Sequence, residues 1–244
     1  MVITGKPNLS VVLLCYRSEE AILSYVEDLK TCLTELDIEW EIILVANYIA
    51  GSNDRTPEIV KDIAKKDSRI KALAKEKKGM MGWDMKCGLE NATGEIIAVT
   101  DGDGQFPMVD IARVYKKLID EDMDVVKTYR FKRHDGWYRT TLSDTYNFII
   151  NIIFPKLSCH DVNSKPKILR AEALHKMDLL SDDWFIDAEI MIQTRRLKLK
   201  FAEISTQFEK LDSRKSFVKP GAIIEFIVNI ILFRLREFRF LFKK

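Results

Sequence analysis

The stretch "EIIAVTDGDGQFP" (residues 95–107) decides the fold, because it joins a short apolar run to a pair of acids. The run EIIAVTD has the length and composition of a buried strand, and glycine and proline follow it closely. Asp101 and Asp103 stand one glycine apart where the run ends. Two carboxylates this close repel each other, and a divalent cation with oxygen ligands relieves that repulsion. The stretch therefore predicts a strand that ends at an acidic site.

Strand-like and helix-like segments alternate on both sides of this stretch. The alternation is typical of an α/β fold in which helices flank a mostly parallel sheet. Ligands of such sheets bind beyond the carboxyl ends of the strands, which is where the two acids would lie. The sequence predicts strands at 9–16, 40–47, 70–75, 95–101 and 123–130, and helices at 19–36, 56–66, 81–92 and 108–121.

The predicted metal ligands are Asp101, Asp103 and Gln105, and the predicted ion is Mn²⁺ or Mg²⁺. An ion held by one or two protein carboxylates completes its shell with water and substrate phosphates, so we expect a substrate that carries a diphosphate. Gly102 would let the backbone approach such a ligand closely. The alternative is a solvated turn, since Asp and Gly are both favoured in turns. The position at the end of a predicted strand favours the metal site.

Composition excludes several other classes of protein. The 244 residues contain 39 Lys and Arg against 37 Asp and Glu, so the net charge of +2 gives no reason to expect nucleic-acid binding. The four cysteines have neither zinc-site nor disulfide-framework spacing, which suggests reduced, cytosolic thiols. We expect no signal peptide at the N-terminus and no membrane-spanning helix, because the longest apolar stretch, 222–233, is too short.

In order and spacing, the segments resemble family 2 glycosyltransferases of GT-A fold, within them the branch of dolichol-phosphate mannose synthase and other polyprenyl-phosphate glycosyltransferases. The likeness runs from residue 9 to about 218. The last of the matching segments resembles the family's acidic helix near the acceptor. The segments are VVLLCYRSEEAI (11–22), EIILVANYIAGSNDRTPEIV (41–60), KKGMMGWDMKCGLENATGE (77–95), TDGDGQFP (100–107), VVKTYRF (125–131) and FIDAEIMIQTRRLKLKFAEI (185–204).

The resemblance also implies a set of site residues. Those implied to bind the nucleotide sugar are Tyr16, Arg17, Glu19, Asn47, Asp54, Lys78, Asp101, Gly102 and Arg130. Those implied to be catalytic are Asp187, Glu189 and Asp161. Asp187 and Glu189 are two residues apart and would point to different sides of a helix, and the resemblance favours Asp187 for the acceptor side. Alternatively, both acids could have no catalytic role and be present because the helix dipole stabilises carboxylates near a helix N-terminus.

One departure from the family pattern concerns the nucleotide base. The family usually carries an acidic pair after its second strand, where this chain has Ala46 and Asn47. The Asn47 amide could still hydrogen-bond a base, because it both donates and accepts. The sequence therefore leaves the identity of the nucleotide open.

The last third of the chain is apolar and basic. We predict a glycosyltransferase domain over residues 1–218 and a C-terminal helix over 219–244, with a second apolar segment at 144–157. From Arg234 onward there are five Lys or Arg and one Glu. That composition suits a helix in the interface of an anionic membrane, but also a core helix or a contact in a homo-oligomer.

These features together predict an inverting glycosyltransferase. It would move a sugar from a nucleoside diphosphate to a polyprenyl phosphate, as a cytoplasmic protein peripheral to the inner face of the membrane. One alternative acceptor is a sugar hydroxyl of a surface polysaccharide or other glycan. Another alternative is a nucleotide- or membrane-binding protein without turnover. A nucleotidyltransferase is disfavoured, because no glycine-rich activation loop lies near residue 16.

Overall fold

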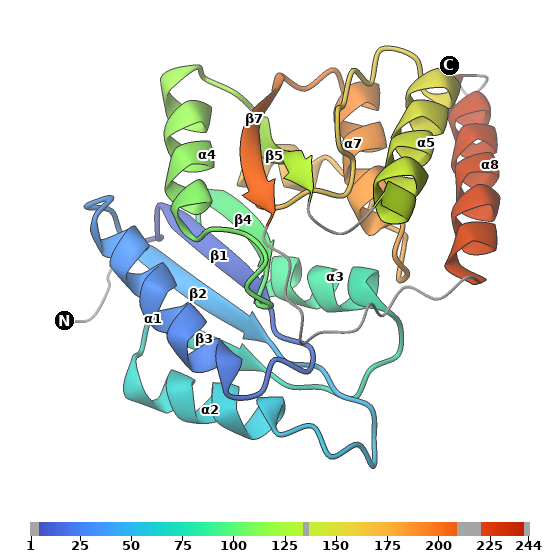
Figure 1. The fold of residues 1–244 in the computed structure, drawn as a ribbon. Coiled ribbons are helices and arrows are strands. Elements are labelled where there is room, and N and C mark those ends of the chain that lie inside the picture. Colours follow the sequence, from blue (N-terminus) through green and yellow to red (C-terminus); the bar gives the residue numbers. More distant parts are fainter. Residues whose placement is uncertain (1–4, 134–136, 209–220, 242–244) are drawn as a thin grey trace.

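The computed structural model describes residues 5–133, 137–208 and 221–241. A single sheet runs through the molecule in the strand order β3-β2-β1-β4-β6-β5-β7 (Figure 1). Its strands are β1 (Leu9–Leu14), β2 (Trp40–Val45), β3 (Ile70–Leu73), β4 (Ile96–Asp101), β5 (Val125–Arg133), β6 (Lys167–Arg170) and β7 (Phe201–Phe208).

The sheet is mostly parallel, which confirms the predicted α/β class. Strands β3, β2, β1 and β4 run parallel to one another, and β5 runs parallel to β7. The exception is β6, which pairs antiparallel with β4 on one side and with β5 on the other. This four-residue strand was not predicted from the sequence, and it carries residues of the candidate site.

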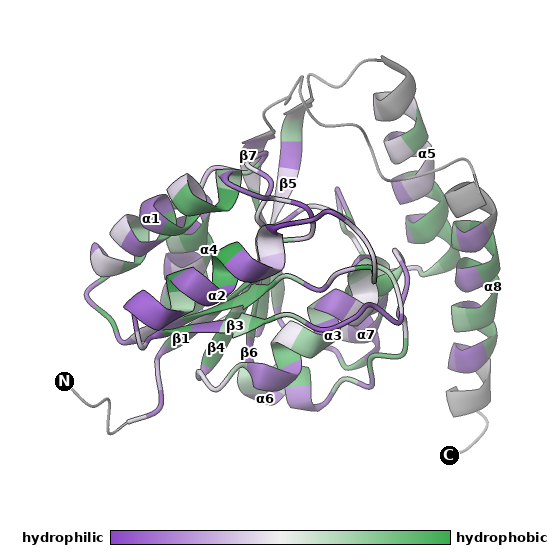
Figure 2. Cartoon of the chain, turned by 90° about the horizontal axis from the view of Figure 1, so that it is seen from below, coloured by the Kyte–Doolittle hydropathy of each residue, from purple (hydrophilic) through white to green (hydrophobic). Residues whose placement is uncertain are grey.

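Helices cover both faces of the sheet (Figures 1 and 2). On one face lie α1 (Ala21–Thr34), α2 (Thr56–Lys66) and α4 (Val109–Asp120). On the other face lie α3 (Met81–Asn91), α5 (Trp137–Ile153), α7 (Ile186–Arg196) and α8 (Gly221–Leu241), together with the short α6 (Ala171–His175). The segment 185–204, which resembles the acidic helix of the family, contains helix α7 and the start of strand β7.

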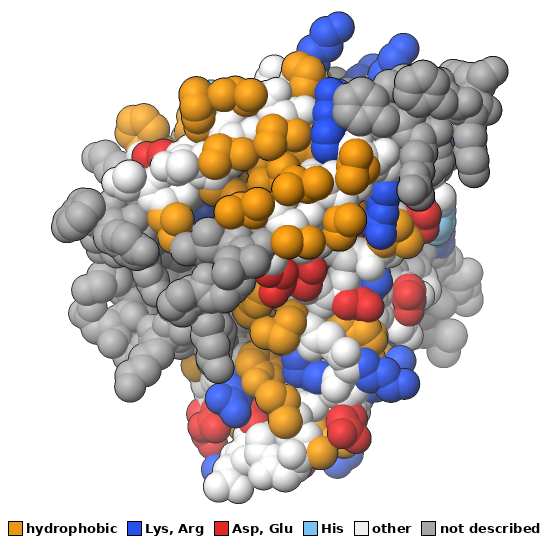
Figure 3. Space-filling model, turned by 90° about the vertical axis from the view of Figure 1, so that its right-hand side faces the viewer, with side chains coloured by type: hydrophobic (Ala, Val, Ile, Leu, Met, Phe, Trp, Pro, Cys, Tyr) orange, Lys and Arg blue, Asp and Glu red, His pale blue; other side chains and the backbone are white. Residues whose placement is uncertain are grey.

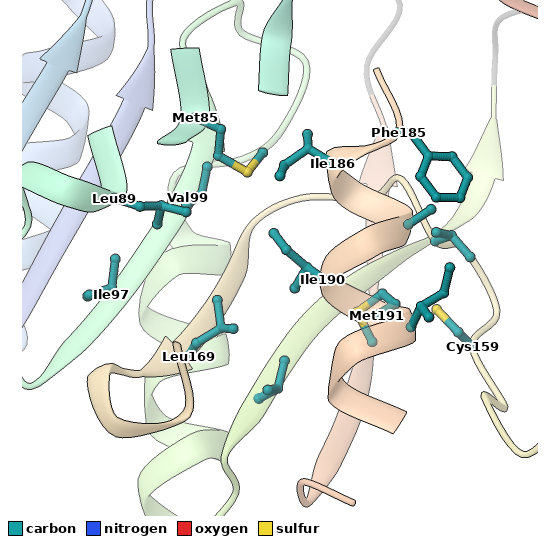
Figure 4. Close-up of a cluster of buried hydrophobic side chains, with 14 of the residues drawn as sticks. Met85, Leu89, Ile97, Val99, Cys159, Leu169, Phe185, Ile186, Ile190 and Met191 are labelled. Carbon is teal, nitrogen blue, oxygen red and sulfur yellow. The ribbon is translucent and has the colours of Figure 1, made fainter. Parts of the chain in front are cut away.

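The alternation of side chains along each strand produces two separate cores. Val12, Val99 and Leu169 point toward α3 and α7, where they meet Met85 and Ile190 (Figure 4). The strand residues between them point the other way, toward the apolar stripes of α1, α2 and α4. The two buried layers hold the sheet rigid, so the strand ends are fixed positions for functional side chains.

Helices α5 and α8 stand side by side at the edge of the molecule (Figures 1 and 2). The rings of Tyr146 and Phe226 join them, with centroids 5.0 Å apart. Ile230 and Phe233 of α8 are buried in the core that α7 shares. The predicted boundary between residues 218 and 219 lies outside the described residues. Within the described ranges no helix is long and apolar enough to cross a membrane.

Candidate donor and acceptor site

The carboxyl ends of β1 and β4 meet at one edge of the sheet. Leu14 pairs with Asp101, the last residue of β4. The loops that follow these strands are bonded together, because the Ser18 hydroxyl donates to the carbonyl oxygen of Gly102 at 2.8 Å. The Asp101 side chain keeps a quarter of its surface exposed at this edge. The sheet therefore presents the first predicted metal ligand where parallel strands bind ligands.

The loop after β4 carries the other two predicted metal ligands. The backbone N–H of Gln105 donates to Asp103 Oδ1 at 3.1 Å, which folds the loop into a tight turn. Gly104 has a φ of +88°, and a Cβ there would meet the Tyr25 hydroxyl, so the turn requires glycine. Phe106 is buried and anchors the end of the loop.

The donor set fits a magnesium- or manganese-type ion in part. Two half-buried carboxylates and one amide are hard oxygen donors on a single loop, and such ions take the rest of their shell from water and phosphates. Among the residues that the structure describes, no cluster of three or more Asp, Glu, His or Cys side chains could hold an ion alone. An ion held at this loop would therefore take its remaining ligands from water or from substrate oxygens.

Gly102 is packed between the loops at this edge and the core. Its N–H donates to the carbonyl oxygen of Leu14 at 2.8 Å, and its carbonyl accepts from Ser18. A Cβ at Gly102 would lie 3.1 Å from Ile22 Cδ1 and 3.2 Å from the Leu14 oxygen. The missing side chain thus leaves room for the protein's own core, and the predicted approach of a ligand to the Gly102 backbone stays a prediction.

Two buried lysines, both missed by the sequence analysis, pair with the predicted site acids Asp101 and Asp187. Lys165 Nζ lies 3.2 Å from Asp101 Oδ2 and 3.0 Å from Asp187 Oδ2, so one ammonium lies between the two carboxylates. Lys167 Nζ lies 2.5 Å from Asp187 Oδ1 and 3.0 Å from the Ser164 carbonyl oxygen. Asp187 is fully buried and paired with both ammonium groups.

A third buried lysine lies beside this pair. In the sheet, Lys127 of β5 is opposite Lys167 of β6 on one side and Glu203 of β7 on the other. Lys127 Nζ bonds to Glu203 at 2.8 Å and to the carbonyl oxygen of Asp161 at 2.5 Å. Like charges opposite each other in a sheet are unfavourable, and the two opposed lysines are paired with different carboxylates, Lys127 with Glu203 and Lys167 with Asp187.

The environment shifts the pKa values of Lys165, Lys167 and Asp187. Burial favours the neutral form of Lys165, but the carboxylates of Asp101 and Asp187 outweigh it and raise its pKa. Burial lowers the pKa of Lys167 to about 8, with the charges of Lys127 and Lys165 adding to the effect and Asp187 opposing it. For Asp187, burial is outweighed by the two lysines, and its pKa lies below the ordinary value. Asp187 is therefore a carboxylate that resists protonation.

The other two predicted catalytic acids are also engaged. Asp161 receives two bonds from the guanidinium of Arg130, at 2.5 Å and 2.9 Å. Glu189 is fully buried, and its oxygens accept from the backbone N–H groups of Leu180 at 2.9 Å and Ser181 at 2.8 Å. Asp187 and Glu189 thus point to different sides of α7, as their spacing requires. Glu189 holds the loop before α7.

The end of β2 carries a buried polar network where the family pattern has acids. Asn47 is fully buried; its amide donates to Asp84 Oδ1 at 2.9 Å, and its oxygen accepts from the Lys75 N–H at 2.9 Å. Asp84 of α3 is also paired with Lys77, whose Nζ lies 4.4 Å from the centre of the Tyr16 ring. Asn47 thus positions the carboxylate of Asp84 and uses both of its hydrogen-bonding groups within the protein.

The remaining predicted donor residues surround this network. Arg17 and Glu19 are exposed and have φ values of 55° and 46°, a left-handed conformation unusual for these residues. Lys78 is exposed next to the paired Lys77, which the sequence reasoning passed over. Asp54 accepts from the backbone N–H of Thr56 at 3.0 Å and so caps the start of α2.

The start of α3 is bonded to the loop before α7. The N–H groups of Met80 and Gly82 donate to the carbonyl oxygens of Asp182 and Asp183, at 2.7 Å and 3.0 Å. A Cβ at Gly82 would lie 2.5 Å from the Ser181 oxygen, so only glycine allows this approach. The donor-side helix and the acceptor-side loop are therefore in direct backbone contact.

Comparison with known proteins relates this arrangement to glycosyltransferases. The sequence model of the family described as "Glycosyl transferase family 2" matches residues 10–178. The undecaprenyl-phosphate 4-deoxy-4-formamido-L-arabinose transferase of Proteus mirabilis is 28% identical over 217 residues, which is 87% of this chain and 64% of that protein. The Pectobacterium atrosepticum protein of the same name is 32% identical over 145 residues, 59% of this chain and 43% of the relative. The chain thus spans less than two thirds of the length of either relative.

Solved structures share the fold. The glucosyl-3-phosphoglycerate synthase of Mycobacterium tuberculosis, in complex with Mn²⁺, UDP and glucosyl-3-phosphoglycerate, superposes with a TM-score of 0.71 at 19% identity, covering 93% of this chain and 80% of that one. The complex of the same enzyme with Mg²⁺ and UDP gives a TM-score of 0.70 at 18% identity, over 93% and 79% of the two chains.

Proposed function

Because the chain belongs to glycosyl transferase family 2, we propose that it transfers a sugar from a nucleoside diphosphate to a polyprenyl phosphate with inversion at the anomeric carbon. An oxygen of the acceptor phosphate forms the new bond to that carbon, and the bond to the donor diphosphate breaks. Two relatives bear the name of undecaprenyl-phosphate sugar transferases, which supports a lipid phosphate as the acceptor. A polyprenyl phosphate is a membrane lipid, so the protein would work peripherally at the inner face of the membrane.

The state of the three predicted catalytic acids carries the proposal. A hydroxyl acceptor needs a general base, whereas a phosphate is ionised near neutral pH and needs none. Asp187 is buried between two ammonium groups, Asp161 is held by Arg130, and Glu189 is bonded to backbone N–H groups. All three of these carboxylates, which lie in the described part of the chain, are engaged by protein donors rather than left open toward an acceptor. The site therefore suits an acceptor that arrives already charged.

The donor would bind at the edge formed by β1 and β4. Asp101, Asp103 and Gln105 would hold the divalent ion. When bound, Mn²⁺ or Mg²⁺ supplies Lewis-acid stabilisation of the charge that develops on the leaving diphosphate. Arg130 would share that work, because a guanidinium contacts two phosphate oxygens at once, and Asp161 fixes its orientation. Lys78 is an exposed cation on the same side, and Tyr16 lies at the end of β1 beside the network that holds Asp84.

A transfer assay tests the proposal. The purified chain is incubated with Mn²⁺, a panel of labelled UDP- and GDP-sugars and a short-chain polyprenyl phosphate in detergent. We expect a labelled lipid that mild acid releases as free sugar, because a sugar joined to a phosphate is acid-labile. Asp101→Asn should abolish its formation. An acid-stable product made from an added glycan would instead establish transfer to a hydroxyl, and nucleotide binding without turnover would establish a binding protein.

A further inference from the structure

The ammonium group of Lys165 is held by three elements of the structure at once. Its Nζ lies 3.2 Å from Asp101 Oδ2 at the end of β4, 3.0 Å from Asp187 Oδ2 on α7, and 3.4 Å from Met81 Sδ at the start of α3. A lysine has three N–H donors, and these three contacts account for them. The group therefore has a defined position beside the first predicted metal ligand.

The backbone that carries Lys165 is fixed as well. The Thr128 hydroxyl of β5 donates to the Lys165 carbonyl oxygen at 2.5 Å, and the Thr128 N–H donates to the Pro166 oxygen at 3.1 Å. If the ammonium moved away, the buried carboxylate of Asp187 would lose one of its two charged partners, which is costly. Lys165 should therefore stay beside Asp101 when an ion arrives.

Lys165 carries a positive charge that salt screens only weakly. Figure 3 shows Lys, Arg, Asp and Glu side chains on one face of the molecule, where solvent and dissolved ions screen their charges. Lys165, by contrast, is only 3% exposed. Burial alone would lower its pKa, but the carboxylates of Asp101 and Asp187 outweigh burial and raise the pKa, so the ammonium stays protonated near neutral pH.

A divalent ion at Asp101 would share this carboxylate with the ammonium. Near neutral pH the charges of Lys165 and Lys167 balance those of Asp101 and Asp187, so the ion adds positive charge to a group of side chains that is already neutral. Like charges this close repel each other strongly where screening is weak. A nucleoside diphosphate removes the conflict, because its phosphate oxygens bring negative charge to the ion.

We propose that Lys165 is a positioning residue that weakens the binding of a free divalent ion at Asp101, so that the ion binds mainly as its complex with the nucleoside diphosphate. Lys165 acts through the Asp101 carboxylate, whose charge it partly neutralises. The inference rests on the proposed function, because that function supplies both the ion and the diphosphate. Its consequence is that ion and donor enter the site together.

Mn²⁺ titration of the full chain, followed by the EPR signal of the free ion, tests the proposal without any turnover. Lys165→Met should bind Mn²⁺ alone more tightly than the wild type by roughly tenfold or more, because the repelling charge is gone. The preformed Mn²⁺–UDP and Mn²⁺–GDP complexes, measured by calorimetry, should bind this variant no more tightly than the wild type. A gain of affinity for one form of the ion only is not a result that a damaged fold would give.

Three variants serve as controls, and circular dichroism checks the fold of each. Lys165→Arg keeps the charge and should bind Mn²⁺ alone as weakly as the wild type. Lys165→Gln removes the charge but keeps an N–H donor, so it should repeat the gain in a second neutral variant. Lys65→Met removes a lysine whose side chain is 75% exposed on α2 and should behave like the wild type.

Three results would overturn the inference: neutral variants that bind Mn²⁺ alone no more tightly than the wild type, an equal gain for Mn²⁺ alone and for its nucleotide complexes, or an arginine variant that gains as much as the neutral ones. The detergent transfer assay separates this inference from the proposed function. Binding of a Mn²⁺–nucleotide complex without sugar transfer refutes the proposed function alone. Sugar transfer by a chain whose neutral variants bind Mn²⁺ like the wild type refutes the role of Lys165 alone.

Discussion

The free energy of unfolding should contain a contribution from Lys167 that rises with pH between pH 7 and 9.5, and replacing Lys167 by methionine should remove it. Lys167 is fully buried, and its pKa falls from 10.5 to about 8 in the folded protein. Between these two values the unfolded chain binds a proton that the folded protein does not. Stability must therefore rise with pH over this interval, because folding no longer requires a charged ammonium to be buried.

The size of the effect follows from the same two values. The difference between a pKa of 10.5 and one of about 8 corresponds to about 3 kcal/mol, of which about 2 kcal/mol should be recovered between pH 7 and 9.5. The Lys167→Met variant has no such group to titrate. The wild type should thus gain about 2 kcal/mol relative to the variant over this range.

Urea unfolding at pH 7, 8, 8.5, 9 and 9.5 measures this difference. The informative quantity is the gap between the unfolding free energies of wild type and variant, because other titrating groups cancel in it. Lys65→Met, at a lysine exposed on α2, serves as the matched control and should give a gap that stays constant. A difference in unfolding free energy, wild type minus Lys167→Met, that stays constant or decreases as the pH rises would refute the reasoning.

Three further substitutions test the site. Asp187→Asn should cost about 3–5 kcal/mol in urea unfolding, because it leaves two buried ammonium groups without their carboxylate; a loss below 1 kcal/mol would contradict that pairing. Arg130→Lys should cost about 1–2 kcal/mol, since a lysine cannot keep both bonds to the neighbouring carboxylate, and unchanged stability would argue against the bidentate contact. Gly104→Ala should lower the melting temperature more than Gly51→Ala, because both glycines have positive φ but only a Cβ at residue 104 meets Tyr25. Equal shifts for the two glycine variants would show that backbone strain alone matters.

Regular alternation made most of the fold predictable. Strong periodicity and Pro57 near the start gave the helix over 56–66 with the bounds that the structure has. Strand β6 was missed because it has only four residues and begins at Lys167, the last residue of the stretch "NSKPK" (163–167), so no apolar run marks its start. The spacing of two residues between Lys165 and Lys167 was the available signal, since it puts both ammonium groups on one side of an extended segment.

The sequence motifs made some residues of the candidate site predictable, but not the partners with which those residues interact. The positions of Asp101 and Asp103 followed from the end of an apolar strand. The partners of Asp187 did not, because burial of a lysine is decided by tertiary contacts that no local pattern encodes. The same limit applies to Asn47, whose amide serves Asp84 on a helix 37 residues away.

The glycine contact at the start of α3 has a consequence for attempts to engineer this enzyme. Residues 79–82 are hydrogen-bonded through their backbone to residues 181–183. A change in the conformation of either segment would therefore displace the other. If these two segments contact the donor and the acceptor of the proposed transfer, libraries that randomise one segment at a time should yield variants whose preferences for both substrates change together. To change the two preferences independently, Gly82 and the backbone carbonyl groups that it contacts would have to be left unchanged.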